Sequence, residues 1–81
     1  MTWYTIYTQA GRKCPYCVKA AELLDNEGAA YHMRPLEIEA LREVAGRANM
    51  TTVPIIYHGV NLVGGYDDLA TYIKEGADAL S

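Results

Sequence analysis

The chain has no excess of positive charge and no long apolar run. Lys and Arg number 7 against 10 for Asp and Glu, which gives a formal net charge of -3. A protein that binds phosphate backbones needs clustered Lys and Arg in excess, so this composition argues against nucleic acid as a partner. The longest apolar runs, such as residues 53–57, fall far short of the roughly 20 residues that a membrane-spanning helix requires. Residues 1–4 lack the basic start and apolar stretch of a secretory signal, so we expect a cytoplasmic protein without a membrane partner.

Cysteine and histidine are scarce, and phenylalanine is absent. The two cysteines are Cys14 and Cys17. Structural disulfides are rare in a reducing cytoplasm, so we expect this pair to be catalytic or metal-binding. His32 falls in a predicted strand and His58 in a predicted turn, so both are placed on the surface and given no role. The chain has 7 tyrosines. Five of them are scattered over predicted strands and helices, which indicates packing in the core and at sheet edges rather than a surface for stacking bases; they are Tyr4, Tyr7, Tyr31, Tyr57 and Tyr72.

The length and composition predict a single globular domain over residues 1–81. The chain has 51% hydrophobic and 21% charged residues, and it contains no repeat, low-complexity stretch or polar linker. A chain this short buries only about 60 to 65% of the surface that it exposes when unfolded, so we expect modest stability. We also expect a monomer.

Segments rich in β-branched and aromatic residues predict four strands. They span residues 3–8, 30–34, 53–57 and 60–63. Pro35 is expected to end the second strand, because proline has no N–H to give to a ladder. His58-Gly59 is expected to form the tight turn of a hairpin between the last two strands.

Apolar residues at spacings of three and four predict three helices. They begin at about residues 15, 37 and 67 and stop at Gly28, Asn49 and Gly76. Val18 is counted with the apolar face of the first helix, and Pro15 suits its first turn, where the missing N–H would have no helical partner. Either Asp67 or Asp68 can cap the third helix.

The order of these elements predicts the fold class. Strands joined through a helix should be parallel, and the two strands of the hairpin should be antiparallel. We therefore predict an α/β fold with a mixed four-stranded sheet flanked by three helices.

The two cysteines enclose Pro15 and Tyr16 where the first strand and its loop pass into the first helix. Unpaired N–H groups and the positive end of the helix dipole stabilise an anion there, so we expect the thiol pKa of Cys14 to lie below its ordinary value of about 8.5. Cys17 lies one turn further into the helix and should be less exposed. This asymmetry predicts that Cys14 attacks a substrate disulfide and that Cys17 resolves the mixed disulfide.

Two other interpretations of the cysteine pair stay open. A structural disulfide that closes a two-residue gap would constrain the unfolded chain little, so it would stabilise the fold poorly. A zinc site would need His32 and His58 as further ligands, and neither has the usual paired-ligand spacing. We therefore expect no bound metal.

Three motifs follow one another along the chain. They are Cys14-Pro15-Tyr16-Cys17, Thr52-Val53-Pro54 and Gly64-Gly65-Tyr66-Asp67-Asp68. A Cys-x-x-Cys pair beside a strand–helix–strand pattern is typical of thioredoxin-like redox proteins. With all three motifs in order, the chain resembles the glutaredoxin family over nearly its whole length. The resemblance implies a thioredoxin-like fold and an enzyme that reduces protein disulfides and glutathione mixed disulfides with electrons from glutathione.

The resemblance also implies a set of glutathione-binding residues. In the family the proline that corresponds to Pro54 is cis, and the backbone at the position of Val53, after Thr52, pairs with the cysteine of glutathione. The residues after the glycine pair, here Tyr66, Asp67 and Asp68, would hold the γ-glutamyl end, and Tyr16 would line the groove. The alternatives are that Val53 is a plain strand residue, that Asp67 and Asp68 only cap a helix, and that Tyr16 only shields the cysteines.

The loop before Cys14 departs from the common family pattern. Many glutaredoxins have a lysine three residues before the first cysteine, and Gly11 stands there in this longer loop. Some phage glutaredoxins have a similar loop with a lysine directly before the cysteine. Lys13 would then lower the thiol pKa, while Gln9 or Arg12 contacts glutathione. A solvated basic patch at Arg12 and Lys13 is the alternative.

Ribonucleotide reductase is one client that the family resemblance implies. One rival function is a redoxin recharged by thioredoxin reductase, against which the motif Tyr66-Asp67-Asp68 argues. Another rival is a carrier of an iron-sulfur cluster with Cys14 and glutathione as ligands. Pro15 argues against that carrier, because family members specialised for clusters usually have glycine at this position.

Overall fold

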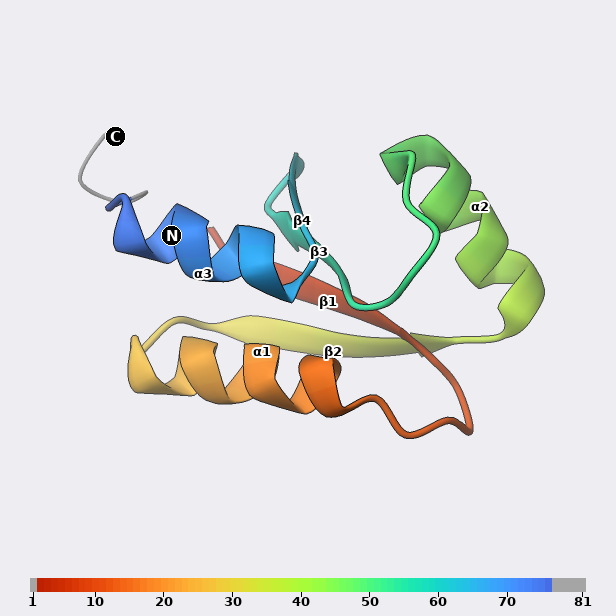
Figure 1. The fold of residues 1–81 in the computed structure, drawn as a ribbon, viewed down its shortest axis with the longest axis horizontal. Helices are drawn as coiled ribbons and strands as arrows, with labels where there is room; N and C mark the ends of the chain where they lie inside the picture. Colours follow the sequence, from red (N-terminus) through yellow and green to blue (C-terminus); the bar gives the residue numbers. More distant parts are fainter. Residues whose placement is uncertain (1, 77–81) are drawn as a thin grey trace.

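The computed structural model describes residues 2–76 and contains four strands and three helices. Their bounds are β1 Tyr4–Gln9, α1 Pro15–Asn26, β2 Tyr31–Leu36, α2 Ile38–Ala48, β3 Ile55–His58, β4 Asn61–Gly64 and α3 Tyr66–Lys74 (Figure 1). This is the predicted order of strands and helices. No helix within the described residues is both long enough and apolar enough to cross a membrane.

The four strands form one mixed sheet in the order β2-β1-β3-β4. β1 pairs with β2 in parallel and with β3 in antiparallel orientation, and β3 and β4 form an antiparallel hairpin. The prediction of a mixed sheet with a parallel first pair and an antiparallel hairpin is confirmed. β1 is a central strand, so its carboxyl end, which leads to the cysteines, lies between β2 and β3.

Helices cover both faces of the sheet. Ile56 faces a cluster that includes Leu24 of α1 and Leu69 of α3, whereas its neighbour Ile55 faces a second cluster that includes Leu41 of α2. Successive strand residues point to opposite faces, so two adjacent isoleucines supply both layers of the core. Figure 1 shows the resulting arrangement, with α1 and α3 at one end of the molecule and α2 at the other.

Several local predictions are confirmed. Pro15 is the first residue of α1, and Asn49 closes α2 in the left-handed conformation with φ 55°. Asparagine tolerates this conformation better than most residues, because its short polar side chain bonds locally. The Val53–Pro54 peptide bond is cis, as the resemblance implied.

Other local predictions are wrong. β2 continues through Pro35 to Leu36, because an edge strand has one side without a ladder to complete. The hairpin is shifted: β3 begins only at Ile55 and includes His58, so His58 is partly buried and not in a surface turn. Val18 lies outside the core and is 56% exposed, although it shares the helical spacing of its buried neighbours.

Candidate active site

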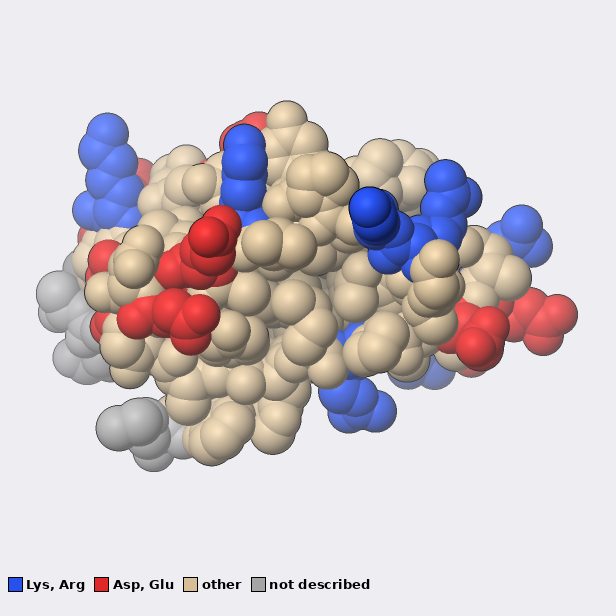
Figure 2. Space-filling model, turned by 90° about the horizontal axis from the view of Figure 1, so that it is seen from below, with Lys and Arg blue, Asp and Glu red and all other residues tan. Residues whose placement is uncertain are grey.

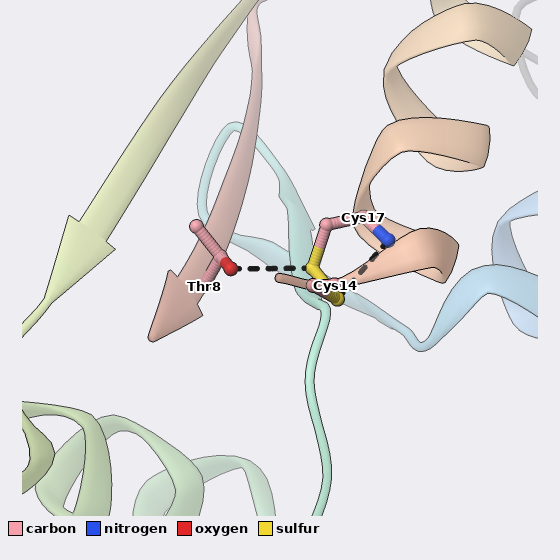
Figure 3. The surroundings of a disulfide bond; sticks show 3 residues. All are labelled: Thr8, Cys14 and Cys17. Carbon is pink, nitrogen blue, oxygen red and sulfur yellow. Dashed lines mark hydrogen bonds between the residues drawn. A yellow bond between two sulfur atoms is a disulfide. The ribbon is translucent and has the colours of Figure 1, made fainter. Parts of the chain in front are cut away.

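Cys14 and Cys17 form a disulfide at the start of α1 (Figure 3). Their Cα atoms lie 5.2 Å apart. Cys14 is the N-cap residue of α1, and its sulfur accepts a hydrogen bond from the Cys17 backbone N–H at 3.2 Å. The loop after β1 therefore brings both sulfurs to the positive end of a 12-residue helix.

The two cysteines differ in burial, as the sequence predicts. Cys14 is partly exposed, whereas Cys17 is only 3% exposed. In the reduced protein, the backbone N–H of Cys17 and the helix dipole both favour negative charge on the Cys14 sulfur. A substrate therefore reaches Cys14 more easily than Cys17.

Thr8 contacts the buried sulfur, and the sequence analysis did not single it out. Its Oγ1 lies 3.3 Å from the Cys17 Sγ (Figure 3). A disulfide sulfur carries no proton, so the threonine hydroxyl is the donor in this state. The alternation along β1 could have indicated this position, since Tyr4, Ile6 and Thr8 all face inward and only Thr8 is polar.

One cavity opens directly on the disulfide and has a volume of about 380 Å³. Its lining residues are Thr8, Arg12, Lys13, Cys14, Pro15, Cys17, Val18 and Met33. Arg12 and Lys13 are exposed and lie on this side of the site, toward β2. The structure therefore brings the two predicted cations to the cysteines, but beside Val18 and Met33 rather than beside Val53.

Another cavity, of about 400 Å³, lies between α2 and the segment before β3. Its lining residues are Gln9, Ile38, Leu41, Arg42, Ala45, Thr51, Thr52, Val53 and Ile55. It brings together Gln9, Thr52 and Val53, three of the residues that the sequence analysis named. Arg42 was not expected here. In the sequence Arg42 is an exposed residue of a helix, which does not mark it as a site residue. Only tertiary packing brings α2 close to Thr52.

The remaining predicted residues lie at the start of α3 and of α1. The rings of Tyr16 and Tyr66 lie 6.0 Å apart between centroids, so they link the beginnings of the two helices. The Asp68 carboxylate accepts a hydrogen bond from the Gly65 N–H at 3.1 Å, whereas Asp67 is exposed in the first turn of α3. Asp68 therefore caps α3 from inside its first turn, with Gly65 as the N-cap residue.

The two histidines make contacts away from the cysteines. His32 stacks on Trp3 with ring centroids 4.4 Å apart. His58 stacks on Tyr4 at 4.0 Å, and its Nδ1 lies 2.7 Å from the Tyr72 hydroxyl. Within residues 2–76 no group of three or more His, Cys, Asp and Glu side chains gathers as a metal site would require.

A thioredoxin-like fold with a Cys-x-x-Cys disulfide at a strand-to-helix junction defines the class of thiol–disulfide oxidoreductases. The sequence model of one family in this class, glutaredoxin, matches residues 4–63. The chain is 41% identical to a glutaredoxin of Pseudomonas aeruginosa over 78 residues, which cover 93% of this chain and 90% of the relative. It is 37% identical to glutaredoxin 3 of Escherichia coli over 78 residues, with 93% and 92% covered. The chain therefore belongs to the glutaredoxin family and is a thiol–disulfide oxidoreductase.

Solved structures agree with this assignment. The solution structure of a glutaredoxin from Brucella melitensis superposes with a TM-score of 0.79 at 37% identity, covering 99% of this chain and 88% of the other. A buckwheat glutaredoxin–glutathione complex superposes with a TM-score of 0.75 at 21% identity, covering 93% and 71%. At that lower identity the match to the buckwheat protein supports the fold alone.

Proposed function

We propose that this glutaredoxin takes its electrons from glutathione and reduces both protein disulfides and glutathione mixed disulfides. The observation that carries the proposal is the asymmetry of the cysteine pair. Cys14 is accessible at a helix N-terminus, with a backbone N–H on its sulfur, and Cys17 is buried behind it. An exposed nucleophile with a shielded resolving thiol suits the exchange between glutathione and a client disulfide.

The reaction begins with attack by the Cys14 thiolate on one sulfur of the client disulfide. A bond forms between Cys14 and that sulfur, and the other client sulfur leaves as a thiolate, which takes a proton from water. The Cys17 thiolate then attacks Cys14, forms the disulfide seen here and releases the client as a second thiolate. Two glutathione molecules return the electrons: one opens the disulfide at Cys14 and the other frees Cys14 as glutathione disulfide.

The cavity beside α2 supports a position for the glycine end of glutathione. Glutathione is a tripeptide with a carboxylate at each end and an ammonium at the γ-glutamyl end. Arg42 supplies a guanidinium, and Gln9 and Thr52 supply polar groups, in the same cavity as Val53. In this proposal Arg42 and Gln9 bind the glycine carboxylate, and the backbone of Val53 pairs with the cysteine of glutathione. Arg12 and Lys13 attract the anion from the other side of Cys14.

The start of α3 supports a position for the γ-glutamyl end. Its first N–H groups and the positive end of the helix dipole favour the ligand's carboxylate there. Asp67 is exposed beside them, so we assign it to the ligand's ammonium, and Tyr16 and Tyr66 line the groove between α1 and α3. Asp68 contributes by holding Gly65, because its carboxylate already accepts that N–H.

The proposal extends to the setting of the reaction. We propose a monomeric single domain over residues 1–81 that works in the cytoplasm, where glutathione keeps thiols reduced. Ribonucleotide reductase is the first protein client to test, because the family resemblance implies it.

The test is NADPH oxidation coupled to a small disulfide substrate. Glutathione with glutathione reductase is compared with thioredoxin reductase alone, and the Cys14→Ser variant serves as the blank. Turnover that requires glutathione supports the proposal, and Arg42→Gln and Asp67→Asn should then each raise the KM for glutathione about tenfold. Turnover with thioredoxin reductase alone would contradict it.

A further inference from the structure

The flank of the active site toward β2 is apolar and lies away from the proposed glutathione groove. We call it the flank cavity; it is the cavity of about 380 Å³ that both cysteines line. Met33 on β2 forms one wall, whereas Val53 precedes β3. Since β1 lies between β2 and β3, the flank cavity lies toward one neighbour of β1, and the cavity that holds Val53 and Arg42 lies toward the other.

Two large apolar side chains on this flank face solvent. Val18 is 56% exposed and Met33 is 39% exposed. A single exposed apolar residue requires no explanation, but these two line the same cavity as the reactive sulfurs. Pro15 adds a third apolar surface beside them. A partner that covered this flank would remove apolar area from water next to Cys14.

The flank cavity is also edged by positive charge in a chain whose net charge is negative. Arg12 and Lys13 are both exposed and both line it. On the face shown in Figure 2, acidic side chains gather over the C-terminal half of α1, and several basic side chains lie toward the end that holds the loop before α1, with a further acidic group at the outer edge of that end. A partner that enters the flank cavity therefore meets the two cations Arg12 and Lys13 and no acidic side chain among the described residues that line it.

We propose that the flank cavity binds the protein client, by seating an apolar side chain next to the client's reactive cysteine while an acidic neighbour pairs with Arg12 or Lys13. The proposal rests on the proposed attack by Cys14 but not on the use of glutathione. It gives client and glutathione separate approaches to the same sulfur. The preferred client segment is an acidic stretch that carries an apolar residue beside its cysteine.

The test uses pre-reduced protein in a single turnover without glutathione. The substrates are short peptides whose cysteine is disulfide-bonded to thionitrobenzoate and is followed by Leu-Glu-Glu, Gly-Glu-Glu or Leu-Lys-Lys. Cys14 attacks the peptide sulfur, thionitrobenzoate leaves as a coloured thiolate, and Cys17 then releases the peptide. The second-order rate constant for the Leu-Glu-Glu peptide should be the highest, and its advantage over Leu-Lys-Lys should fall as salt is added.

The variant Val18→Ser/Met33→Ser separates binding on this flank from general damage. It should lower the rate constant for the Leu-Glu-Glu peptide about tenfold and leave the Gly-Glu-Glu peptide nearly unchanged, because only leucine fills the cavity. Leu62→Ser is the matched control, since Leu62 is 44% exposed on β4 at the opposite edge of the sheet. It should change neither rate constant.

Three results would overturn the proposal. Equal rate constants for all three peptides would show no selection on this flank. If the double variant lowered the rate constants for the leucine and glycine peptides equally, it would be acting on the reactivity of the cysteines and not on binding of the leucine. Sedimentation that shows a dimer, dissociated by Val18→Ser/Met33→Ser, would make a second copy of the chain the occupant. Failure of the glutathione-coupled assay alone would leave this test intact, because no glutathione takes part in it.

Discussion

At the scale of single residues, the contact between Thr8 and Cys17 has the clearest chemical consequence. When a thiol opens the disulfide at Cys14, negative charge develops on the Cys17 sulfur, and the Thr8 hydroxyl lies within hydrogen-bond distance of it. A hydrogen bond to a charged group in a buried site stabilises the charge more than it would in water. We therefore expect Thr8 to act as a positioning residue that favours Cys17 as a leaving group and as the proposed resolving thiolate.

Replacing Thr8 with valine keeps the shape of the side chain and removes the donor. We expect Thr8→Val to lower the fraction of Cys17 present as thiolate at a given pH about tenfold. The thiolate absorbance of the Cys14→Ser background, measured with and without Thr8→Val, checks this. Thr8→Ser should restore the thiolate. Thr5→Val, the same change on the opposite face of β1, should have no effect, and an equal change with Thr5→Val would contradict the role of Thr8.

The sequence predicted the position of the cysteine pair and its difference in burial, but it gave no sign of Thr8 or Arg42. Cys14 and Cys17 owe their relation to helical spacing, which is local and therefore visible in the sequence. Thr8 and Arg42 reach these cavities only through tertiary packing, of β1 beside the start of α1 and of α2 beside the segment before β3. Exposed Val18 shows the converse error, since periodicity identifies an apolar face without showing whether the fold covers all of it.

At the scale of elements, the start of α3 connects the fold to the proposed glutathione groove. Asp68 accepts the Gly65 N–H, and a side chain on Gly64 would collide with that carboxylate. The glycine pair thus lets the chain turn closely around the cap before α3 begins. Sequence patterns predicted the helix and its acidic first turn, but Asp67 and Asp68 were equal candidates for its cap. Only the path of the backbone decides which carboxylate accepts the Gly65 N–H.

Removing the Asp68 cap should weaken α3 without removing the ammonium partner that we assign to Asp67. We expect Asp68→Ala to lower the free energy of unfolding by about 1 kcal/mol, the usual value of a helix cap. Asp67→Ala should change the free energy of unfolding less and the KM for glutathione more. Urea unfolding and the coupled assay, carried out on both variants, measure the two quantities. If Asp67→Ala lowered stability more and Asp68→Ala raised the KM more, Asp67 would be the cap and Asp68 the ammonium partner.

The contact between β2 and α1 gives the protein a predictable response to alkaline pH. Burial, and then the Asp25 carboxylate that accepts the Tyr31 hydroxyl at 3.2 Å, raises the pKa of Tyr31 above its ordinary value of 10.0. The unfolded chain loses this proton first, so the contribution of Tyr31 to stability is fully present below about pH 10 and is lost as the pH rises further. Tyr31→Phe should reduce that fall. The loss of stability is measured as the difference between the urea midpoints of the oxidised protein at about pH 8 and pH 11. If Tyr31→Phe left that difference unchanged, Tyr31 would not be the group responsible.

At the scale of the whole molecule, the two layers of the core meet in a single strand. Ile55 and Ile56 are each fully buried, one under α2 and the other under α1 and α3. Because the same strand carries both, the loss of either layer removes support for the other. A chain of this length has little stability to spare, so we expect both layers to unfold together as one domain.

Alanine at either isoleucine should therefore destabilise the whole protein. We expect Ile55→Ala and Ile56→Ala each to lower the free energy of unfolding by about 2 to 5 kcal/mol, because each leaves a cavity in one layer. Val60→Ala is the control, since Val60 is 94% exposed and its substitution should change stability by less than about 0.5 kcal/mol.

Trp3 fluorescence reports on the side of β1 and β2, where Trp3 stacks on His32. For every variant it should give the same urea midpoint as circular dichroism. Separate midpoints for Ile55→Ala would mean that the α2 layer unfolds by itself. Since α2 carries Arg42, local opening there would weaken the proposed binding of glutathione before the cysteines lose their positions.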